Sequence, residues 1–177
     1  MKVRAYERRV VWITGASDGI GEALARQLAN EGAALALTAR RAGKLEALAE
    51  ELRADGARCE AFAGDVTDAA AMREIAQRIE ERWGAIDVLV SNAGIYLKTA
   101  DGEFDLAMIE RQLRVNLLGS IYSIGAALEI MRKQKAGRIV GVASLAGYRG
   151  LPRSAAYGAS KAGIICWRAY LSRQRTT

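Results

Sequence analysis

Short apolar segments alternate with segments of helical periodicity along almost the whole chain, and this alternation restricts the fold more than any other feature. Strands are expected at residues 8–14, 33–39, 58–66, 86–94 and 138–144. Helices are expected at residues 19–32, 41–56, 68–84 and about 105–135, and another from the segment YGASK (157–161) onward. Such alternation is typical of β-α-β units, whose parallel strands are covered by helices on both faces. Because their crossovers are right-handed, we expect an α/β fold with a doubly wound parallel sheet and the strand order 3-2-1-4-5.

Length and composition predict one folded unit. The chain has 177 residues, about the size of one domain, and hydrophobic residues make up 51% of it, which is enough to fill a core. We therefore expect a single domain over residues 1–177. No run of about 18 apolar residues is present, and the first residues, MKVRAYERRVVWITG, lack the apolar stretch of a signal peptide. These features predict a cytoplasmic protein without a membrane partner.

The chain contains no histidine, and this absence excludes several kinds of catalytic site. A Ser-His-Asp triad, a Cys-His pair and a histidine metal site are impossible, and Cys59 and Cys166 do not have the spacing of a zinc site. We therefore expect no metal. Acid–base chemistry near neutral pH must use Tyr, Lys, Asp or Glu side chains, or a cofactor.

Charge is distributed unevenly along the chain. The net charge is +6, yet no Asp or Glu follows Met131, where ten Lys or Arg residues occur. A basic segment can indicate binding to nucleic acid or to a membrane surface. These basic residues are dispersed among small and apolar positions, however, without a polybasic run or a ladder of aromatic residues. We therefore expect no nucleic-acid partner, and we treat residues 166–177 as an atypical basic tail of the domain.

The first expected strand ends in a glycine-rich turn, TGASDGIG (14–21), that opens a helix. Because Gly15, Gly19 and Gly21 lack Cβ atoms, the backbone can turn tightly and approach a pyrophosphate, while the helix N-terminus offers free N–H groups. The position of this turn in the first β-α-β unit predicts a Rossmann-like dinucleotide site. The same residues match G-x-S-x-G, the nucleophile elbow of certain hydrolases, but that elbow requires a histidine base.

The end of the second expected strand indicates which dinucleotide is preferred. Folds that select NAD usually have an acidic residue about 20 residues after the turn, where it binds the ribose 2′-hydroxyl. This chain has Thr38-Ala39-Arg40-Arg41 instead. Arginine can bind a 2′-phosphate through charge-assisted hydrogen bonds, so NADP(H) is favoured over NAD(H). The alternative is that the two arginines only solvate the start of the next helix.

Three further motifs complete a pattern that resembles a known family. The segment SNAG (91–94) follows the fourth strand, Ser144 ends the fifth, and YGASK (157–161) begins thirteen residues later. Together with TGASDGIG, in this order and on these elements, they resemble the short-chain dehydrogenases/reductases of the NADP-preferring type. The resemblance extends from Val10 to about Ile165.

The resemblance implies a role for each residue of the catalytic motif. Tyr157 is similar to the acid that protonates a carbonyl oxygen as hydride arrives, or that deprotonates a hydroxyl in the reverse direction. Lys161 lies one helical turn further on, and its ammonium is expected to favour the phenolate, because a free phenol ionises only near pH 10. Ser144 is similar to the residue that hydrogen-bonds the substrate oxygen, and Asn116 to the asparagine that anchors a water of the proton relay. The alternatives are a surface contact between Tyr157 and Lys161, a helix cap at Ser144 and a buried amide at Asn116.

The resemblance also implies how the cofactor is held. Lys161 is similar to the lysine that binds the ribose hydroxyls of the nicotinamide nucleotide. Asp65 is similar to the acid that contacts the adenine amino group, and Val66 lies beside the ring. The full set expected to bind the cofactor is Gly15, Ser17, Asp18, Gly19, Ile20, Gly21, Arg40, Arg41, Asp65, Val66, Asn92, Ala93, Gly94, Tyr157 and Lys161.

The family pattern stops after the YGASK helix. The family continues with a further strand, a loop over the nicotinamide, a substrate-covering segment and a last strand, and none of these is recognisable here. We therefore expect a C-terminally truncated member whose fifth strand, with Val140 and Val142, is an exposed edge unless a partner covers it. Ile164, Trp167 and Leu171 form an apolar stripe at helical spacing, and we expect a homo-oligomer.

Two functions from different classes remain open. The motifs favour an NADP(H)-dependent oxidoreductase that interconverts a hydroxyl and a carbonyl group of a small molecule. The unrecognised segments favour a dinucleotide-binding module that is catalytically weak or inactive, or that associates with itself. Tyr148, Leu151 and the loop at residues 94–99 are expected near the substrate but do not define it.

Overall fold

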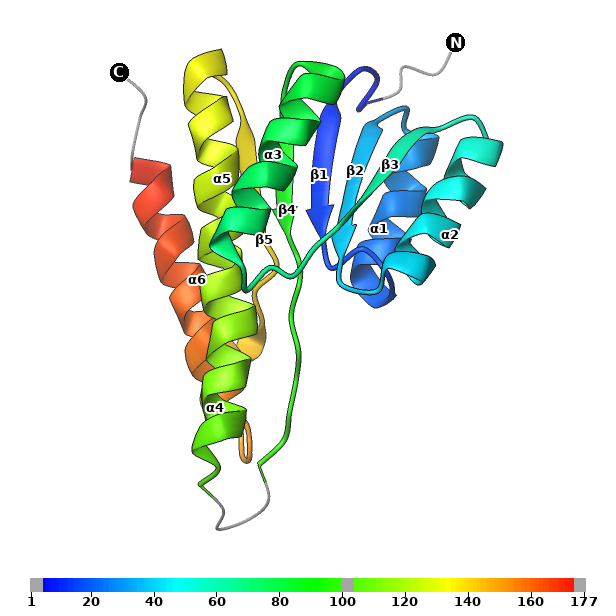
Figure 1. Cartoon of the computed structure of the whole chain (residues 1–177). Coiled ribbons are helices and arrows are strands. Elements are labelled where there is room, and N and C mark those ends of the chain that lie inside the picture. The colour runs from blue at the N-terminus through cyan, green and yellow to red at the C-terminus, as the bar shows by residue number, and fades with distance from the viewer. Residues whose placement is uncertain (1–4, 100–103, 174–177) are drawn as a thin grey trace.

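In the computed structural model, which describes residues 5–99 and 104–173, five parallel strands form one sheet (Figure 1). The strands are β1 (Val10–Thr14), β2 (Ala34–Ala39), β3 (Arg58–Ala63), β4 (Val88–Ser91) and β5 (Arg138–Gly141). Their order is β3-β2-β1-β4-β5, which confirms the predicted doubly wound sheet. Each strand lies within the segment predicted for it. The residues left over at 64–66, 92–94 and 142–144 form loops at the carboxyl ends of the strands.

Helices cover both faces of the sheet. They are α1 (Gly19–Asn30), α2 (Ala42–Ala54), α3 (Ala69–Trp83), α4 (Leu106–Leu113), α5 (Gly119–Gln134) and α6 (Ala155–Arg173), with a π-helix η1 (Arg114–Leu118) and a 3₁₀ helix η2 (Leu145–Gly147). The pair α1 and α2 lies on one face, and α3 and α5 lie on the other (Figure 1). Helix α6 packs against α4 and η1 and begins two residues before Tyr157.

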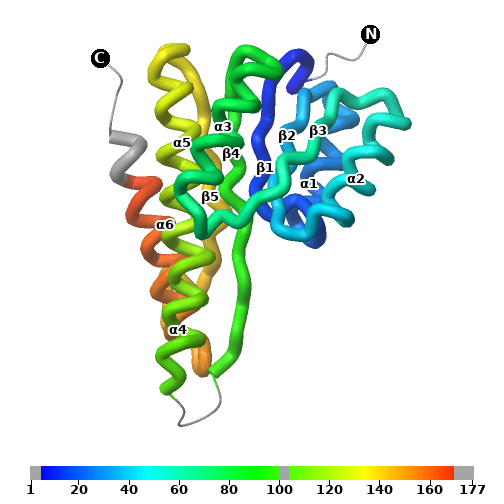
Figure 2. The backbone as a smooth tube through the Cα atoms, in the orientation of Figure 1, coloured from blue at the N-terminus to red at the C-terminus, as the bar shows by residue number. Residues whose placement is uncertain are grey.

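The helical stretch predicted at about 105–135 is one long rod, in which α4 continues through η1 into α5 (Figure 2). Asp105 begins it, because its carboxylate accepts a hydrogen bond from the Met108 N–H at 3.0 Å and satisfies a free helix donor. Lys135, with a φ of 54°, ends it in a left-handed conformation. The π-helical turn in the middle interrupts the regular bonding, and such turns are frequent at functional sites.

Side chains of the central strands alternate between two apolar cores. Val10 and Trp12 of β1 belong to the core beneath α3 and α5, whereas Val11 and Ile13 belong to the core beneath α1 and α2. The indole N–H of the fully buried Trp12 donates to the Thr38 hydroxyl at 2.9 Å, so its polar atom is satisfied.

The fifth strand forms an edge of the sheet, as predicted. Among the described residues it pairs with β4 alone, and Val140 is 40% exposed. Of the predicted apolar stripe on α6, Ile164 is buried and Trp167 partly buried, while the side chain of Leu171 lies outside the described residues. Across the described part of the chain, no helix is both long and apolar enough to span a bilayer. Both cysteines are free thiols.

Candidate active site

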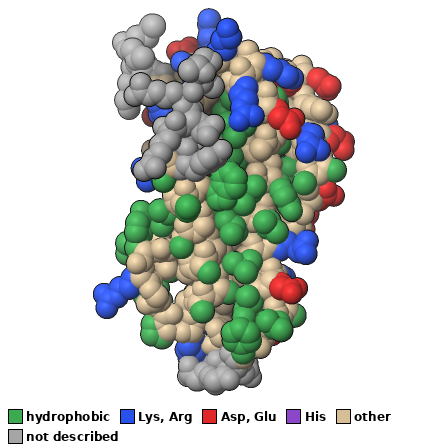
Figure 3. Space-filling model, turned by 90° about the vertical axis from the view of Figure 1, so that its left-hand side faces the viewer, with side chains coloured by type: hydrophobic (Ala, Val, Ile, Leu, Met, Phe, Trp, Pro, Cys, Tyr) green, Lys and Arg blue, Asp and Glu red, His purple; other side chains and the backbone are tan. Residues whose placement is uncertain are grey.

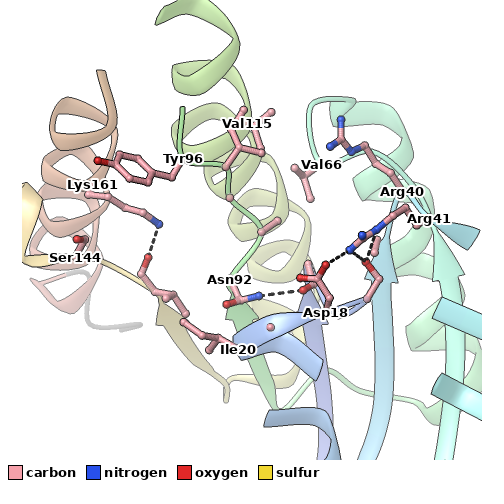
Figure 4. Close-up of a pocket in the computed structure, with 18 of the residues that line it drawn as sticks. Asp18, Ile20, Arg40, Arg41, Val66, Asn92, Tyr96, Val115, Ser144 and Lys161 are labelled. Atoms are coloured by element: carbon pink, nitrogen blue, oxygen red, sulfur yellow. Dashed lines mark hydrogen bonds and ion pairs between the residues drawn. The ribbon is translucent and has the colours of Figure 1, made fainter. Parts of the chain in front are cut away.

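A cleft of about 720 Å³ lies at the carboxyl ends of the strands and brings most of the predicted site residues together (Figure 4). The predicted residues that line it are Gly15, Ser17, Asp18, Gly19, Ile20, Arg40, Arg41, Val66, Asn92, Ala93, Gly94, Ser144, Tyr157 and Lys161. Gly21, Asp65 and Asn116 are not part of the lining. Asp18, Arg40 and Arg41 lie at one end of the cleft, and Tyr96, Ser144 and Lys161 lie at the other.

The glycine turn has three glycines with three different constraints. Gly15 has a φ of 68°, and a Cβ there would lie 2.7 Å from the Ala93 Cα. A Cβ on Gly21 would collide with the Gly15 carbonyl oxygen. Gly19 also has a positive φ, of 58°, but a Cβ there would contact no other part of the described chain. The fold therefore requires glycine at positions 15 and 21. Gly19 leaves open space at the N-terminus of α1, as a phosphate-binding turn needs.

Asn92 joins this turn to the end of β4. Its side-chain nitrogen donates to the carbonyl oxygens of Thr14 and Gly15, at 3.0 and 3.1 Å. The Thr14 hydroxyl accepts hydrogen bonds from the backbone N–H groups of Asn92 and Ala93, at 3.1 and 3.2 Å. The central strands β1 and β4 are thereby fixed to each other where the cleft begins.

Arg41 lies across the mouth of the glycine turn. Its guanidinium donates to the Ser17 hydroxyl at 3.0 Å and forms an ion pair with Asp18. The hydrogen bond from Arg41, together with its charge, holds the pKa of the Asp18 carboxyl below its ordinary value. Both side chains lie in the cleft.

Arg40 faces a second carboxylate on the neighbouring loop. Its guanidinium lies 3.8 Å from Asp65, whose other oxygen accepts hydrogen bonds from the backbone N–H and the hydroxyl of Thr67, both at 2.9 Å. The Arg40 side chain is about half exposed, so it can move to a ligand at this end of the cleft.

Tyr157 and Lys161 extend from the first two turns of α6 toward the other end of the cleft. The Lys161 ammonium donates to the Val142 carbonyl at 2.8 Å and lies 5.6 Å from the centre of the Tyr157 ring. Burial lowers the pKa of Lys161 from its ordinary value. The Ser144 hydroxyl accepts a hydrogen bond from the Ala146 N–H at 3.2 Å, so Ser144 caps η2 while it lines the cleft.

Asn116 lies behind the cleft in the π-helix η1 and is fully buried. Its side-chain oxygen accepts from the Ile95 N–H at 2.7 Å, and its nitrogen donates to the Ile95 carbonyl at 2.9 Å and to the Ser160 hydroxyl at 3.2 Å. A Cβ on Gly94 would lie 3.3 Å from the same amide oxygen and 3.7 Å from the Lys161 nitrogen. Asn116 therefore lies close to Lys161. Its amide binds the Ile95 backbone and Ser160 of α6, and it does not form part of the cleft wall.

Sequence reasoning missed several residues of the lining. They are Ala39, Gly64, Val115, Val142 and Ala143, while Ile95 and Tyr96 were expected only as part of the loop at residues 94–99. Most of them directly adjoin a predicted motif residue, which was the available signal. Tyr96 differs, because its ring lies 4.8 Å from the Tyr157 ring, centre to centre, across 61 residues of sequence.

The comparisons with known proteins agree on one family. A sequence profile described as short chain dehydrogenase matches residues 9–175. The chain is 38% identical over 167 residues to 2,3-dihydro-2,3-dihydroxybenzoate dehydrogenase of Bacillus subtilis, covering 93% of this chain and 63% of that protein. It is 35% identical over 159 residues to the ketoacyl reductase HetN of Nostoc, covering 90% and 55%.

A solved structure gives the same result in three dimensions. The crystal structure of an NAD⁺-bound xylitol dehydrogenase superimposes with a TM-score of 0.90 and 33% identity, covering 95% of this chain and 66% of that one. The chain thus spans between about half and two thirds of the length of these relatives. The profile, the relatives and the fold together show that the chain belongs to the short chain dehydrogenase family, whose members are oxidoreductases that use nicotinamide dinucleotides.

Proposed function

We propose that the protein is an NADP(H)-dependent oxidoreductase that interconverts a hydroxyl and a carbonyl group of a small molecule. One observation carries this proposal: a single cleft is lined by the open glycine turn at one end and by Ser144, Tyr157 and Lys161 at the other. A dinucleotide that lies along the cleft joins these two ends. When bound, its nicotinamide supplies or accepts the hydride.

The arginines support the preference for NADP(H). Arg40 and Arg41 lie in the cleft lining directly after β2, where an acidic residue would favour NAD(H). Ser17, on the facing turn, is already within hydrogen-bond distance of Arg41. These three side chains form a small polar corner that suits a 2′-phosphate, whose charge guanidinium groups neutralise and hydrogen-bond.

The chain's own residues move the proton. In the reducing direction, Tyr157 donates its phenolic proton to the carbonyl oxygen, and Ser144 hydrogen-bonds the same oxygen. The Lys161 ammonium stabilises the phenolate that remains, because the two groups share one face of α6. Asn116 holds the Ile95 backbone and Ser160 beside Lys161 and so keeps this end of the cleft in place. In the oxidising direction, the Tyr157 phenolate removes the proton from the hydroxyl.

The test is the oxidation of NADPH, followed by absorbance, with a panel of ketones and aldehydes. Tyr157→Phe is compared with Tyr6→Phe, a matched change at a partly buried tyrosine that packs against the core beneath α1 and α2 and lies outside the cleft lining. We expect Tyr157→Phe to lower turnover roughly 10²- to 10⁴-fold, the usual contribution of a positioned acid. Tyr6→Phe should have no comparable effect. Equal turnover in the two variants would contradict the proposal.

A dinucleotide-binding module without turnover is the second candidate function. The exposed edge strand β5 favours it, because this strand supports the loop in which Ser144 lies, three residues after the strand ends. Under this alternative, the protein binds NADPH, and no member of the panel is reduced. Binding with turnover that depends on Tyr157 would exclude it.

We also propose self-association in a cytoplasmic setting. Viewed from the side that carries α6, hydrophobic side chains are spread along the middle of the molecule, and charged side chains lie mainly at its margins (Figure 3). The exposed Val140 on the edge strand adds to the surface that a second copy can cover. Sedimentation velocity at several concentrations tests this proposal, and a concentration-independent monomer would contradict it.

A further inference from the structure

Three side-chain carboxamides in the described structure bind the backbone in one way. Each accepts a hydrogen bond from the N–H of a residue with its oxygen and donates to the C=O of that same residue with its nitrogen, as one peptide group does to another in a sheet. We call each arrangement an amide bracket. The three pairs are Gln112 with Leu97, Asn116 with Ile95, and Gln134 with Ile86.

Two of the brackets hold one short segment beside the cleft. Gln112 and Asn116 are four residues apart on the rod of α4 and η1, and their partners Leu97 and Ile95 are alternate residues of the loop after β4. The Gln112 bonds are 2.7 Å from the Leu97 N–H and 3.3 Å to its carbonyl. The Gln112 side chain is buried, so water cannot replace these bonds.

The other side of the segment is bonded to the start of α6. The Tyr96 hydroxyl lies 2.8 Å from the Ser154 hydroxyl, and Ser154 is the buried residue immediately before that helix. The Thr99 N–H and hydroxyl donate to the Arg153 carbonyl at 3.2 and 3.1 Å, and the Arg153 guanidinium donates back to the Thr99 carbonyl at 3.0 Å. Residues 95–99 therefore connect α4 and η1 to the beginning of α6.

These bonds place the Tyr96 ring beside the ring of Tyr157. The Tyr96 ring, fixed between the two brackets and Ser154, lies 4.8 Å from the Tyr157 ring at an angle of 54°. This separation is within the range of attractive aromatic pairs. Tyr157 is thus confined by Tyr96 and by the Lys161 ammonium, and both lie at this end of the cleft (Figure 4).

We propose that Gln112 is a positioning residue for Tyr157. Through its bracket with Leu97, it holds Tyr96 against the Tyr157 ring and so sets where the phenol lies in the cleft. The proposal rests on the proposed function for the catalytic role of Tyr157, but the placement of the ring can be measured without turnover.

The experiment compares Gln112→Met with Gln134→Met. Both changes remove an amide bracket with a side chain of similar length, but Gln134 acts on Ile86, before β4 and away from the cleft. Tyr96→Leu removes the ring itself, and Tyr96→Phe is the conservative variant that keeps the ring. The first readout is the ring resonance of Tyr157 in protein labelled with ¹³C-tyrosine, without cofactor or substrate, assigned by its loss in Tyr157→Phe.

We expect the Tyr157 resonance to shift or broaden in Gln112→Met and Tyr96→Leu and to remain near its original position in Gln134→Met and Tyr96→Phe. The second readout is kinetic. In Gln112→Met and Tyr96→Leu, kcat should fall roughly 10- to 100-fold, as expected for a misplaced catalytic group, with NADPH affinity unchanged. The double variant Gln112→Met/Tyr96→Leu should be no slower than the slower single variant, because both act through one ring.

Equal effects of Gln112→Met and Gln134→Met on the Tyr157 resonance would overturn the proposal, because Gln112 would then only stabilise the fold. If Gln112→Met does not fold, the partly exposed Tyr96 carries the test, and an unchanged Tyr157 resonance in Tyr96→Leu would overturn it. A shifted resonance without turnover in any variant would support the positioning role and contradict the proposed function.

Discussion

The two halves of the sheet are stabilised in different ways. Every residue of β1 and β2 is buried between helices, whereas β5 has only exposed and partly buried residues. The loop after β4 is held instead by polar side chains, because Asn116 and Gln112 each bind the N–H and the C=O of one of its residues. Apolar burial holds the two strands of the half that we assign to the cofactor, and specific hydrogen bonds hold the loop of the half that we assign to catalysis.

This difference implies that binding and turnover can be separated by mutation. Changes near the glycine turn should affect cofactor affinity, and changes on α6 and its neighbours should affect the chemical step.

The largest effect is expected at Gly21, where the two halves meet. In Gly21→Ala the new Cβ collides with the Gly15 carbonyl and lies 2.7 Å from the Asn92 side-chain nitrogen, so the turn and the Asn92 amide that binds it must shift. We expect a loss of roughly 3 kcal/mol in the free energy of unfolding, at the upper end of overpacking costs, and loss of NADPH binding. Urea unfolding and fluorescence titration measure the two effects.

Gly19→Ala is the control for this change. Its Cβ contacts none of the surrounding residues that the structure describes, so the main stability cost is the positive φ, about 1–2 kcal/mol. The methyl group occupies space at the N-terminus of α1, and NADPH affinity should fall although the protein folds. Equal destabilisation of the two alanine variants would mean that the close approach at Gly21 does not limit the fold.

Lys161, in the half that we assign to catalysis, is expected to affect both turnover and the pH dependence of stability. Lys161→Met should lower turnover roughly 100-fold, because the phenolate of Tyr157 loses its ammonium neighbour. Burial lowers the pKa of Lys161 below its ordinary value of 10.5, so the folded protein releases this proton at a lower pH than the unfolded chain. Wild type should therefore gain stability relative to Lys161→Met as the pH rises toward 10.5.

The measurement is urea unfolding of both proteins at a series of pH values between 7 and 10.5. Taking the difference between them removes the titration of all other groups. A difference that does not change with pH, or that changes in the opposite direction, would contradict the assignment of a buried charge to Lys161.

A smaller effect is expected at the ion pair in front of the glycine turn. Asp18 forms an ion pair with the Arg41 guanidinium and places a negative charge beside the proposed 2′-phosphate position. Asp18→Asn should strengthen NADPH binding by up to about fivefold, the usual limit for an exposed pair, and leave NADH binding unchanged. Weaker NADPH binding in this variant would show that Asp18 helps to organise the turn and does not oppose the phosphate.

The smallest expected effect is a difference in reactivity between the two thiols, which depends only on their burial. Burial raises the pKa of the Cys59 thiol to about 12, whereas Cys166 is exposed on α6. In native protein at pH 8, a disulfide reagent should modify Cys166 within minutes and leave Cys59 intact until urea is added. Rapid reaction of Cys59 in native protein would show that the core beneath α1 and α2 opens easily.

Local patterns in the sequence predicted much of this structure. The alternation of short apolar and helical segments predicted the strand order, and the glycines between the first strand and helix predicted the turn. The cleft contains Gly15, Arg40 and Tyr157, as the motifs implied. The ends of the strands were less predictable, because the apolar segments continue into the loops of the site.

Contacts between distant segments were not predictable from one sequence. Gln112 has no motif around it, and its role depends on the path of the chain after β4. Asp65 was expected to face adenine, yet its carboxylate lies against Arg40 and Thr67, because the loop after β3 folds back on itself. Its predicted role in binding adenine remains a proposal.

The central claim is that this cleft selects NADP(H) through the arginines after β2. The most direct test is fluorescence titration with NADPH and with NADH of the wild-type protein, Arg40→Glu and Arg58→Glu. Arg58→Glu makes the same charge change at the start of β3, at the amino ends of the strands, whereas the cleft lies at their carboxyl ends. We predict tighter binding of NADPH than of NADH in wild type and in Arg58→Glu, and loss of that preference in Arg40→Glu. Equal affinities for the two cofactors in wild type, or a preference that survives in Arg40→Glu, would contradict the claim.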